Sequence, residues 1–77
     1  MRTAHPLTDL RPGAAAVVAS LTADPVLRQR LVALGLRPGQ PVQMLRRGWW
    51  SSPLHVRVGM TELMVRRRDA ACVALAA

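Results

Sequence analysis

The segment from residue 24 to residue 39 constrains the fold most, because it contains both ends of one short helix. Asp24 is a good N-cap acceptor, and Pro25 suits the first helical position, where its missing N–H costs nothing. The leucines that follow recur at helical spacing and form one apolar stripe: Leu27, Leu31 and Leu34. The pattern predicts a single helix that begins at Pro25 and buries one face.

The end of this helix is marked as clearly as its start. Gly35 can adopt the left-handed conformation after the last helical residue, and Leu36 can then fold back on Leu31, as in a Schellman ending. Pro38 and Gly39 predict a turn into the following segment. The helix is therefore expected to stop just before Gly35.

The rest of the chain has the pattern of short strands. We expect strands at residues 14–21, 41–47, 54–58, 63–66 and 71–75. The third of these alternates strictly between apolar and polar residues, which is typical of a strand with one buried face. Short strands at this spacing favour a small antiparallel barrel, which would also hide the edges of a five-stranded sheet. The predicted fold class is mostly β, with one helix between the first two strands.

Composition limits the chain to one small domain. Its 77 residues can bury a thin core, which must consist of Val, Leu, Ala and Met because Phe, Tyr and Ile are absent. We expect residues 1–6 to be flexible and residues 7–77 to form the domain. Cys72 has no partner for an internal disulfide, and the N-terminus lacks an apolar signal segment. A cytoplasmic, reducing location is therefore predicted.

Three segments carry a resemblance to a known family. They read Leu7-x-x-Leu10-x-x-Gly13, Arg30-Leu31-x-x-Leu34-Gly35-Leu36-x-x-Gly39 and Pro53-Leu54-x-Val56-x-Val58-x-x-x-x-Leu63-x-Val65-Arg66-x-x-Asp69-Ala70. With them the chain resembles the FeoA family of ferrous iron transport proteins from Leu7 to about Leu75. The middle segment is fairly specific when the other two flank it.

The resemblance implies an SH3-like barrel with a helix between the first two strands. It also implies a small cytoplasmic protein that supports ferrous iron uptake by binding the cytoplasmic side of the FeoB transporter, including its G-protein region. Through that partner the protein would be peripheral to the inner membrane, with no membrane insertion of its own. No cofactor is implied, and the sequence is compatible with both a monomer and a homo-oligomer.

The adjacent tryptophans are the sharpest candidates for a partner contact. Trp49 and Trp50 are the only aromatic residues, and neighbours in an extended segment point to opposite faces, so at most one can be buried in the barrel. An exposed tryptophan is a typical interface anchor, whereas one that plugs the barrel end would serve packing alone. The predicted partner-binding residues are Trp49, Trp50, Arg28, Arg30, Leu34, Gly35, Arg37, Arg46 and Arg47.

The basic residues favour an acidic protein surface, nucleic acid or anionic headgroups. All eleven are arginines and the net charge is +7, although arginine in place of lysine also follows from a GC-rich coding sequence. The simpler interpretation of the helix arginines is a solvated helix face. The alternative is a basic patch of Arg28, Arg37, Arg46 and Arg47 that meets an acidic partner. Arg30 flanks the apolar stripe and is expected to hold a carbonyl or Asp24, while Arg28 projects more freely.

Metal binding and catalysis are not predicted. His5, His55 and Cys72 are scattered, and no pair of ligands shares one element at metal-binding spacing, so the two histidines are at most adventitious ligands. Cys72 is expected to be an inert core residue of the last strand. Residues 66–68 are expected to form a solvated turn. Paired carboxylates, a positioned nucleophile and a Gly-rich phosphate loop are all lacking, so we do not expect an enzyme.

A nucleic-acid-binding barrel is the main alternative to a protein partner, because the positive charge would attract phosphates. Base stacking, however, needs aromatic platforms on a sheet face, and the predicted strands carry none. A peptide-binding SH3 module is a third interpretation, but its proline-rich ligands need a groove lined by several aromatic residues. We therefore expect a protein partner and no nucleic acid.

Overall fold

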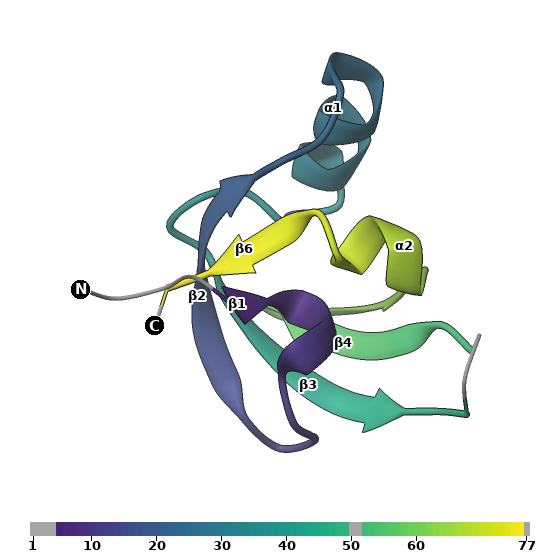
Figure 1. The fold of residues 1–77 in the computed structure, drawn as a ribbon. Coiled ribbons are helices and arrows are strands. Elements are labelled where there is room, and N and C mark those ends of the chain that lie inside the picture. Colours follow the sequence, from purple (N-terminus) through teal and green to yellow (C-terminus); the bar gives the residue numbers. More distant parts are fainter. Residues whose placement is uncertain (1–4, 50–51, 77) are drawn as a thin grey trace.

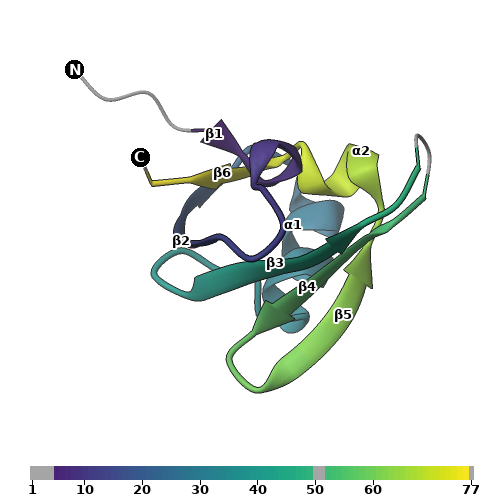
Figure 2. The same ribbon diagram turned by 90° about the horizontal axis from the view of Figure 1, so that it is seen from below.

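The computed structural model describes residues 5–49 and 52–76. Six antiparallel strands form one sheet in the order β1-β6-β2-β3-β4-β5, and it curls around a single core (Figures 1 and 2). The elements in chain order are β1 (His5–Pro6), the 3-10 helix η1 (Leu7–Asp9), β2 (Ala15–Leu21), α1 (Pro25–Ala33), β3 (Pro41–Arg47), β4 (Leu54–Val58), β5 (Thr61–Val65), α2 (Arg67–Ala70) and β6 (Val73–Leu75). In the described residues, no helix is both long enough and apolar enough to cross a bilayer.

Helix α1 begins and ends as the sequence predicts. The Asp24 carboxylate accepts a hydrogen bond from the Leu27 N–H at 2.9 Å, which caps the first turn. At the other end the Leu36 N–H donates to the Leu31 carbonyl at 2.9 Å, and Gly35 has a φ of +103°. These are the bond and the left-handed residue of a Schellman ending, so that prediction is confirmed.

The apolar stripe of α1 is buried less than expected. Leu31 is 1% exposed, but Leu27 is only half-buried and Leu34 is 42% exposed. Figure 1 shows the reason, because α1 projects from one end of the sheet and does not lie across its face. Only the middle of the stripe therefore reaches the core.

The core is aliphatic throughout, as the composition requires. Along β4 the apolar residues point inward and His55 and Arg57 point outward, which confirms the predicted alternation. Leu7 of η1 is fully buried and helps to cover the core. The buried residues are Leu7, Val18, Leu21, Leu31, Leu36, Val42, Met44, Leu54, Val56, Val58, Val65, Ala70, Val73 and Leu75.

The N-terminal segment differs from the expectation of a flexible tail. His5 and Pro6 form β1 and pair with Leu75 and Ala74 of β6, while residues 1–4 lie outside the described part. The sheet thus has six strands where five were expected, and α1 falls between its second and third strands. A strand of two residues has too short a pattern to be recognised from sequence.

The C-terminal part also differs locally. β5 begins at Thr61, two residues before the predicted start, and residues 67–70 form a helical turn in place of the predicted simple turn. In that turn the Arg66 carbonyl accepts from the N–H groups of Asp69 and Ala70 at 3.0 Å and 2.8 Å. The turn buries Ala70 completely, which a solvated loop would not do.

The barrel does not hide both sheet edges, contrary to expectation. β1 and β5 are the outer strands of the pairing order, and among the described residues no pairing joins them. Figure 2 shows β5 at the outer margin of the sheet with no strand beyond it. The backbone of β5 is therefore free along one side.

Candidate docking surface

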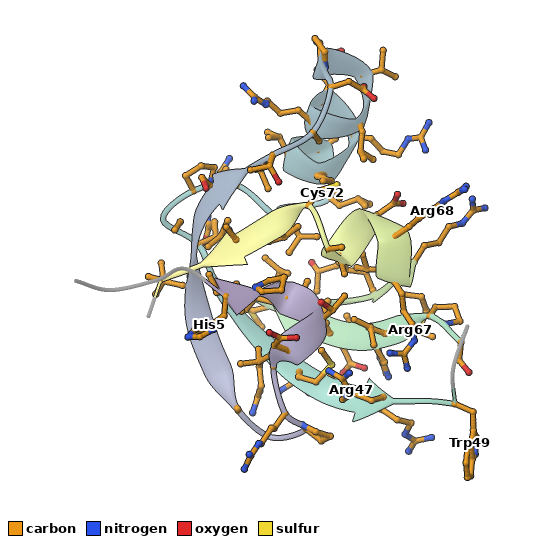
Figure 3. The ribbon with its side chains drawn as sticks, viewed as in Figure 1. His5, Arg47, Trp49, Arg67, Arg68 and Cys72 are labelled. Carbon is orange, nitrogen blue, oxygen red and sulfur yellow. The ribbon has the colours of Figure 1, made fainter. Side chains whose placement is uncertain are left out.

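Trp49 lies at the tip of the loop between β3 and β4 and is 84% exposed. Figure 3 shows its side chain pointing away from the body of the domain. It therefore does not plug the barrel, and so large an exposed aromatic side chain is typical of an interface anchor. Trp50 lies outside the described residues.

Hydrogen bonds and close packing link the described residues on the two sides of the loop tip. The Ser52 N–H donates a hydrogen bond to the Trp49 carbonyl at 2.7 Å. A Cβ atom at Gly48 would lie 2.7 Å from the Cβ of Ser52, so a side chain there would force the loop to shift. Glycine at position 48 permits this close approach.

Arg67 ties the loop to α2. Its Nε donates to the Ser52 carbonyl at 2.9 Å, and its Nη2 donates to the Gly48 carbonyl at 2.8 Å. The two hydrogen bonds connect Arg67 to the residue before Trp49 and to Ser52, which follows it in the same loop. The sequence analysis missed this role, because which arginine of residues 66–68 faces the loop depends on the helical turn α2.

Replacing Arg67 by alanine is expected to lower the free energy of unfolding by about 1–2 kcal/mol, because two bonds from a charged donor are lost. The matched control is Arg68→Ala, since Arg68 is exposed and should change stability by less than about 0.5 kcal/mol. Urea unfolding followed by circular dichroism measures both. Equal effects of the two substitutions would contradict the structural role of Arg67.

Other arginines lie on the elements that flank this loop. Arg66 and Arg68 are exposed, and with Arg67 and Pro53 they line a shallow hollow of about 380 Å³. Arg46, also exposed, lies near the end of β3 that leads into the loop. We call the group formed by Trp49, Arg46, Arg66 and Arg68 the tryptophan surface. It combines one large apolar anchor with positive charge.

Two of the predicted patch arginines are engaged within the chain. Arg28 Nη2 donates to the Leu21 carbonyl at 3.3 Å, and Arg47 Nη1 donates to the carbonyls of Thr8 and of Leu10, the latter at 2.9 Å. Arg47 thereby ties β3 to the N-terminal segment. Arg30, which was expected to hold a carbonyl, is instead exposed, so the expected roles of the two helix arginines are reversed.

Eight of the nine predicted partner residues lie in the described part of the chain, and these eight do not form one continuous surface. Trp49 lies at one end of the molecule and α1 at another, in Figures 1 and 3. Gly35 has a structural explanation in its positive φ and in the 3.2 Å that would separate its Cβ from Val58 Cγ1. Leu34 stays exposed on α1, and Arg37 lies beside Gln40 in the turn that follows.

An exposed charge cluster lies on the outer face of β4 and β5. Glu62 contacts His55 Nε2 at 3.0 Å and Arg57 Nη2 at 3.1 Å. The hydrogen bond from Arg57 lowers the pKa of Glu62 below its usual value, and the charges of Arg57 and His55 act in the same direction. His55 therefore faces a carboxylate that is already paired with an arginine.

Neither the histidines nor Cys72 take part in a cluster of metal ligands. In the described part of the chain, no group of three or more His, Cys, Asp and Glu residues could hold a metal ion. Cys72 precedes β6 and is only half-buried, with its Sγ 3.6 Å from the Arg68 carbonyl. Its expected place inside the last strand was wrong, because that strand starts at Val73.

The fold defines a small, mostly β domain, and the comparisons agree with this class. The FeoA domain matches residues 5–76, so the chain belongs to the FeoA domain family. Proteins of this family are linked to ferrous iron transport. A search of curated proteins finds no match.

Solved structures show the same fold. An iron uptake regulatory protein (FeoA) is 27% identical with a TM-score of 0.89, and the match covers 96% of this chain and 97% of that chain. Stenotrophomonas maltophilia FeoA complexed with zinc, a prokaryotic SH3 domain protein, is 31% identical with a TM-score of 0.79, covering 96% and 89%. The predicted SH3-like fold is thus confirmed. A manganese-dependent transcriptional repressor is 18% identical with a TM-score of 0.88, covering 100% of this chain and 43% of that chain, which is a likeness of fold alone.

Proposed function

We propose that this chain is a non-enzymatic accessory protein of ferrous iron uptake that binds the cytoplasmic G-protein side of a FeoB-type transporter. Its membership of the FeoA domain family over residues 5–76 supports the link to ferrous iron transport. On this proposal the protein works in the cytoplasm and reaches the membrane only through its partner. The six-stranded sheet, with β1 included, acts as one domain.

The observation that carries the proposal is the tryptophan surface. Trp49 is 84% exposed, and Arg67 donates to the carbonyls of Gly48 and Ser52 on either side of it. The arginines around it and the net charge of +7 favour an acidic partner surface. Tryptophan and arginine side chains are enriched among the residues that carry most of the binding energy at protein interfaces.

Isothermal titration of this protein with the soluble G-protein domain of the FeoB-type transporter from the same genome tests the proposal. We expect a 1:1 complex in the micromolar range, which is usual for transient interfaces, and weaker binding as salt is raised. A generic single-stranded oligonucleotide is the control. Tight, salt-steep binding to the oligonucleotide with none to the G-protein domain would overturn the proposal and favour the nucleic-acid alternative.

A further inference from the structure

The free edge of β5 remains unused by the features described so far. β4 and β5 pair through five registered residue pairs, from Leu54 with Val65 to Val58 with Thr61. Among the described residues, no backbone–backbone hydrogen bond joins β5 to any element other than β4. Alternate N–H and C=O groups of this five-residue strand consequently have no partner strand, and Thr61, Glu62 and Met64 are exposed. This is the geometry to which an extended peptide adds as a further strand.

The side chains along this edge provide apolar anchors. Met60 is completely exposed just before the strand, and Met64 is 59% exposed within it. Leu63 is half-buried against the core and packs at its margin. Unbranched methionine side chains adapt to differently shaped partners. Extended segments with apolar side chains at alternate positions would be complementary to such an edge.

The charges around the edge select an acidic occupant. Thr61, at the start of β5, lines the same hollow as Arg37, and the exposed Arg66 follows the last residue of the strand. Glu62 is the one acidic residue on β5, and it is already paired with Arg57 and His55. An arginine thus lies near each end of the edge, and the acidic residue of the strand, Glu62, already has basic partners.

A second copy of this chain fits the edge poorly. Antiparallel pairing of two β5 edges would bring the Arg66 end of each strand toward the Arg37 end of the other. Like charges opposed across a strand pair are destabilising, and each chain carries a net charge of +7. The edge therefore favours a partner of opposite charge.

We propose that the β5 edge is a docking site for an extended acidic segment of another protein, which adds as a strand beside Thr61–Val65. This site shares only Arg66 with the tryptophan surface, and the inference does not depend on the transporter proposal. Main-chain hydrogen bonds would set the register of the added strand. Met60 and Met64 would make apolar contacts with it, and Arg37 and Arg66 would favour acidic side chains.

The probe that tests this proposal is a capped peptide of about eight residues that alternates glutamate with valine. Added to the labelled protein, it should slow hydrogen exchange at β5 amides and shift their NMR signals. A peptide of the same length with lysine in place of glutamate should bind at least about fivefold more weakly. No binding, equal binding of both peptides, or shifts confined to other elements would overturn the proposal.

A pair of matched variants locates the binding. Met64→Glu should weaken peptide binding at least about fivefold, because it removes an apolar contact and adds a like charge. Val26→Glu adds the same charge on α1, where Val26 is 68% exposed, and should leave binding unchanged. Equal loss in both variants would contradict a specific edge site. Dimerisation through β5 without peptide, detected by sedimentation, would assign the edge to a second copy and overturn the acidic partner.

Discussion

Replacing Leu36 by alanine is expected to lower the free energy of unfolding by about 2–5 kcal/mol. Leu36 is 0% exposed and folds back into the core immediately after the Schellman turn of α1. The whole free energy of unfolding for 77 residues is about 4–12 kcal/mol, so this one cavity removes a large fraction of it. The substitution also loosens the attachment of α1, since Leu36 follows directly on its end.

The matched control is Leu34→Ala, two residues earlier. Leu34 is 42% exposed, so its truncation should cost less than about 1 kcal/mol. Urea denaturation of both variants, followed by circular dichroism, gives the comparison. Equal destabilisation by the two substitutions would show that the apolar stripe packs differently from the arrangement described above.

Replacing Trp49 by alanine is expected to weaken binding to the transporter's G-protein domain at least about tenfold, while stability stays within about 0.5 kcal/mol of the parent. The physical reason is that the indole is exposed in the free protein and contributes little to folding. Its large apolar area becomes available on docking. Isothermal titration measures the affinity, and urea denaturation confirms that the variant is folded.

The same Leu34→Ala variant serves as the binding control. Leu34 lies on α1, away from the tryptophan loop, and its truncation should change the affinity by less than about twofold (Figure 1). The opposite result, with loss of binding in Leu34→Ala and none in Trp49→Ala, would move the docking surface to α1. The two variants thereby distinguish docking at the tryptophan surface from docking at α1.

Local signals in the sequence were sufficient to predict the helix and most strands. The cap at Asp24 and the stop at Gly35 act within a few residues, so they can be recognised without knowing the fold. The alternation of β4 is also a local signal, because one face of the strand is buried and the other faces solvent. These elements were predicted correctly for physical reasons that do not depend on distant contacts.

The remaining differences depend on contacts between distant parts of the chain. β1 exists because His5 and Pro6 meet β6, some 70 residues away, which no local pattern reveals. The turn α2 is stabilised by the burial of Ala70, which likewise depends on packing against distant parts of the chain. Long-range packing also decides how much of the α1 stripe is covered.

The candidate site was predictable only in part. The sequence predicted that at most one of the adjacent tryptophans is buried, and Trp49 is 84% exposed. Sequence could not show that Arg28 and Arg47 bind main-chain carbonyls, or that Arg67 holds the tryptophan loop. Each of these contacts joins residues that only the fold brings together. The sequence alone therefore does not indicate which arginine makes which contact.

The most direct test of the docking account is an NMR titration of the labelled protein with the transporter's G-protein domain. The account predicts that the Trp49 indole N–H and the backbone amides of Gly48, Ser52 and residues 66–68 shift or broaden first, at about equimolar partner. Amides of α1 should change little. Binding that leaves the Trp49 indole unchanged, or no change at any amide, would contradict the account.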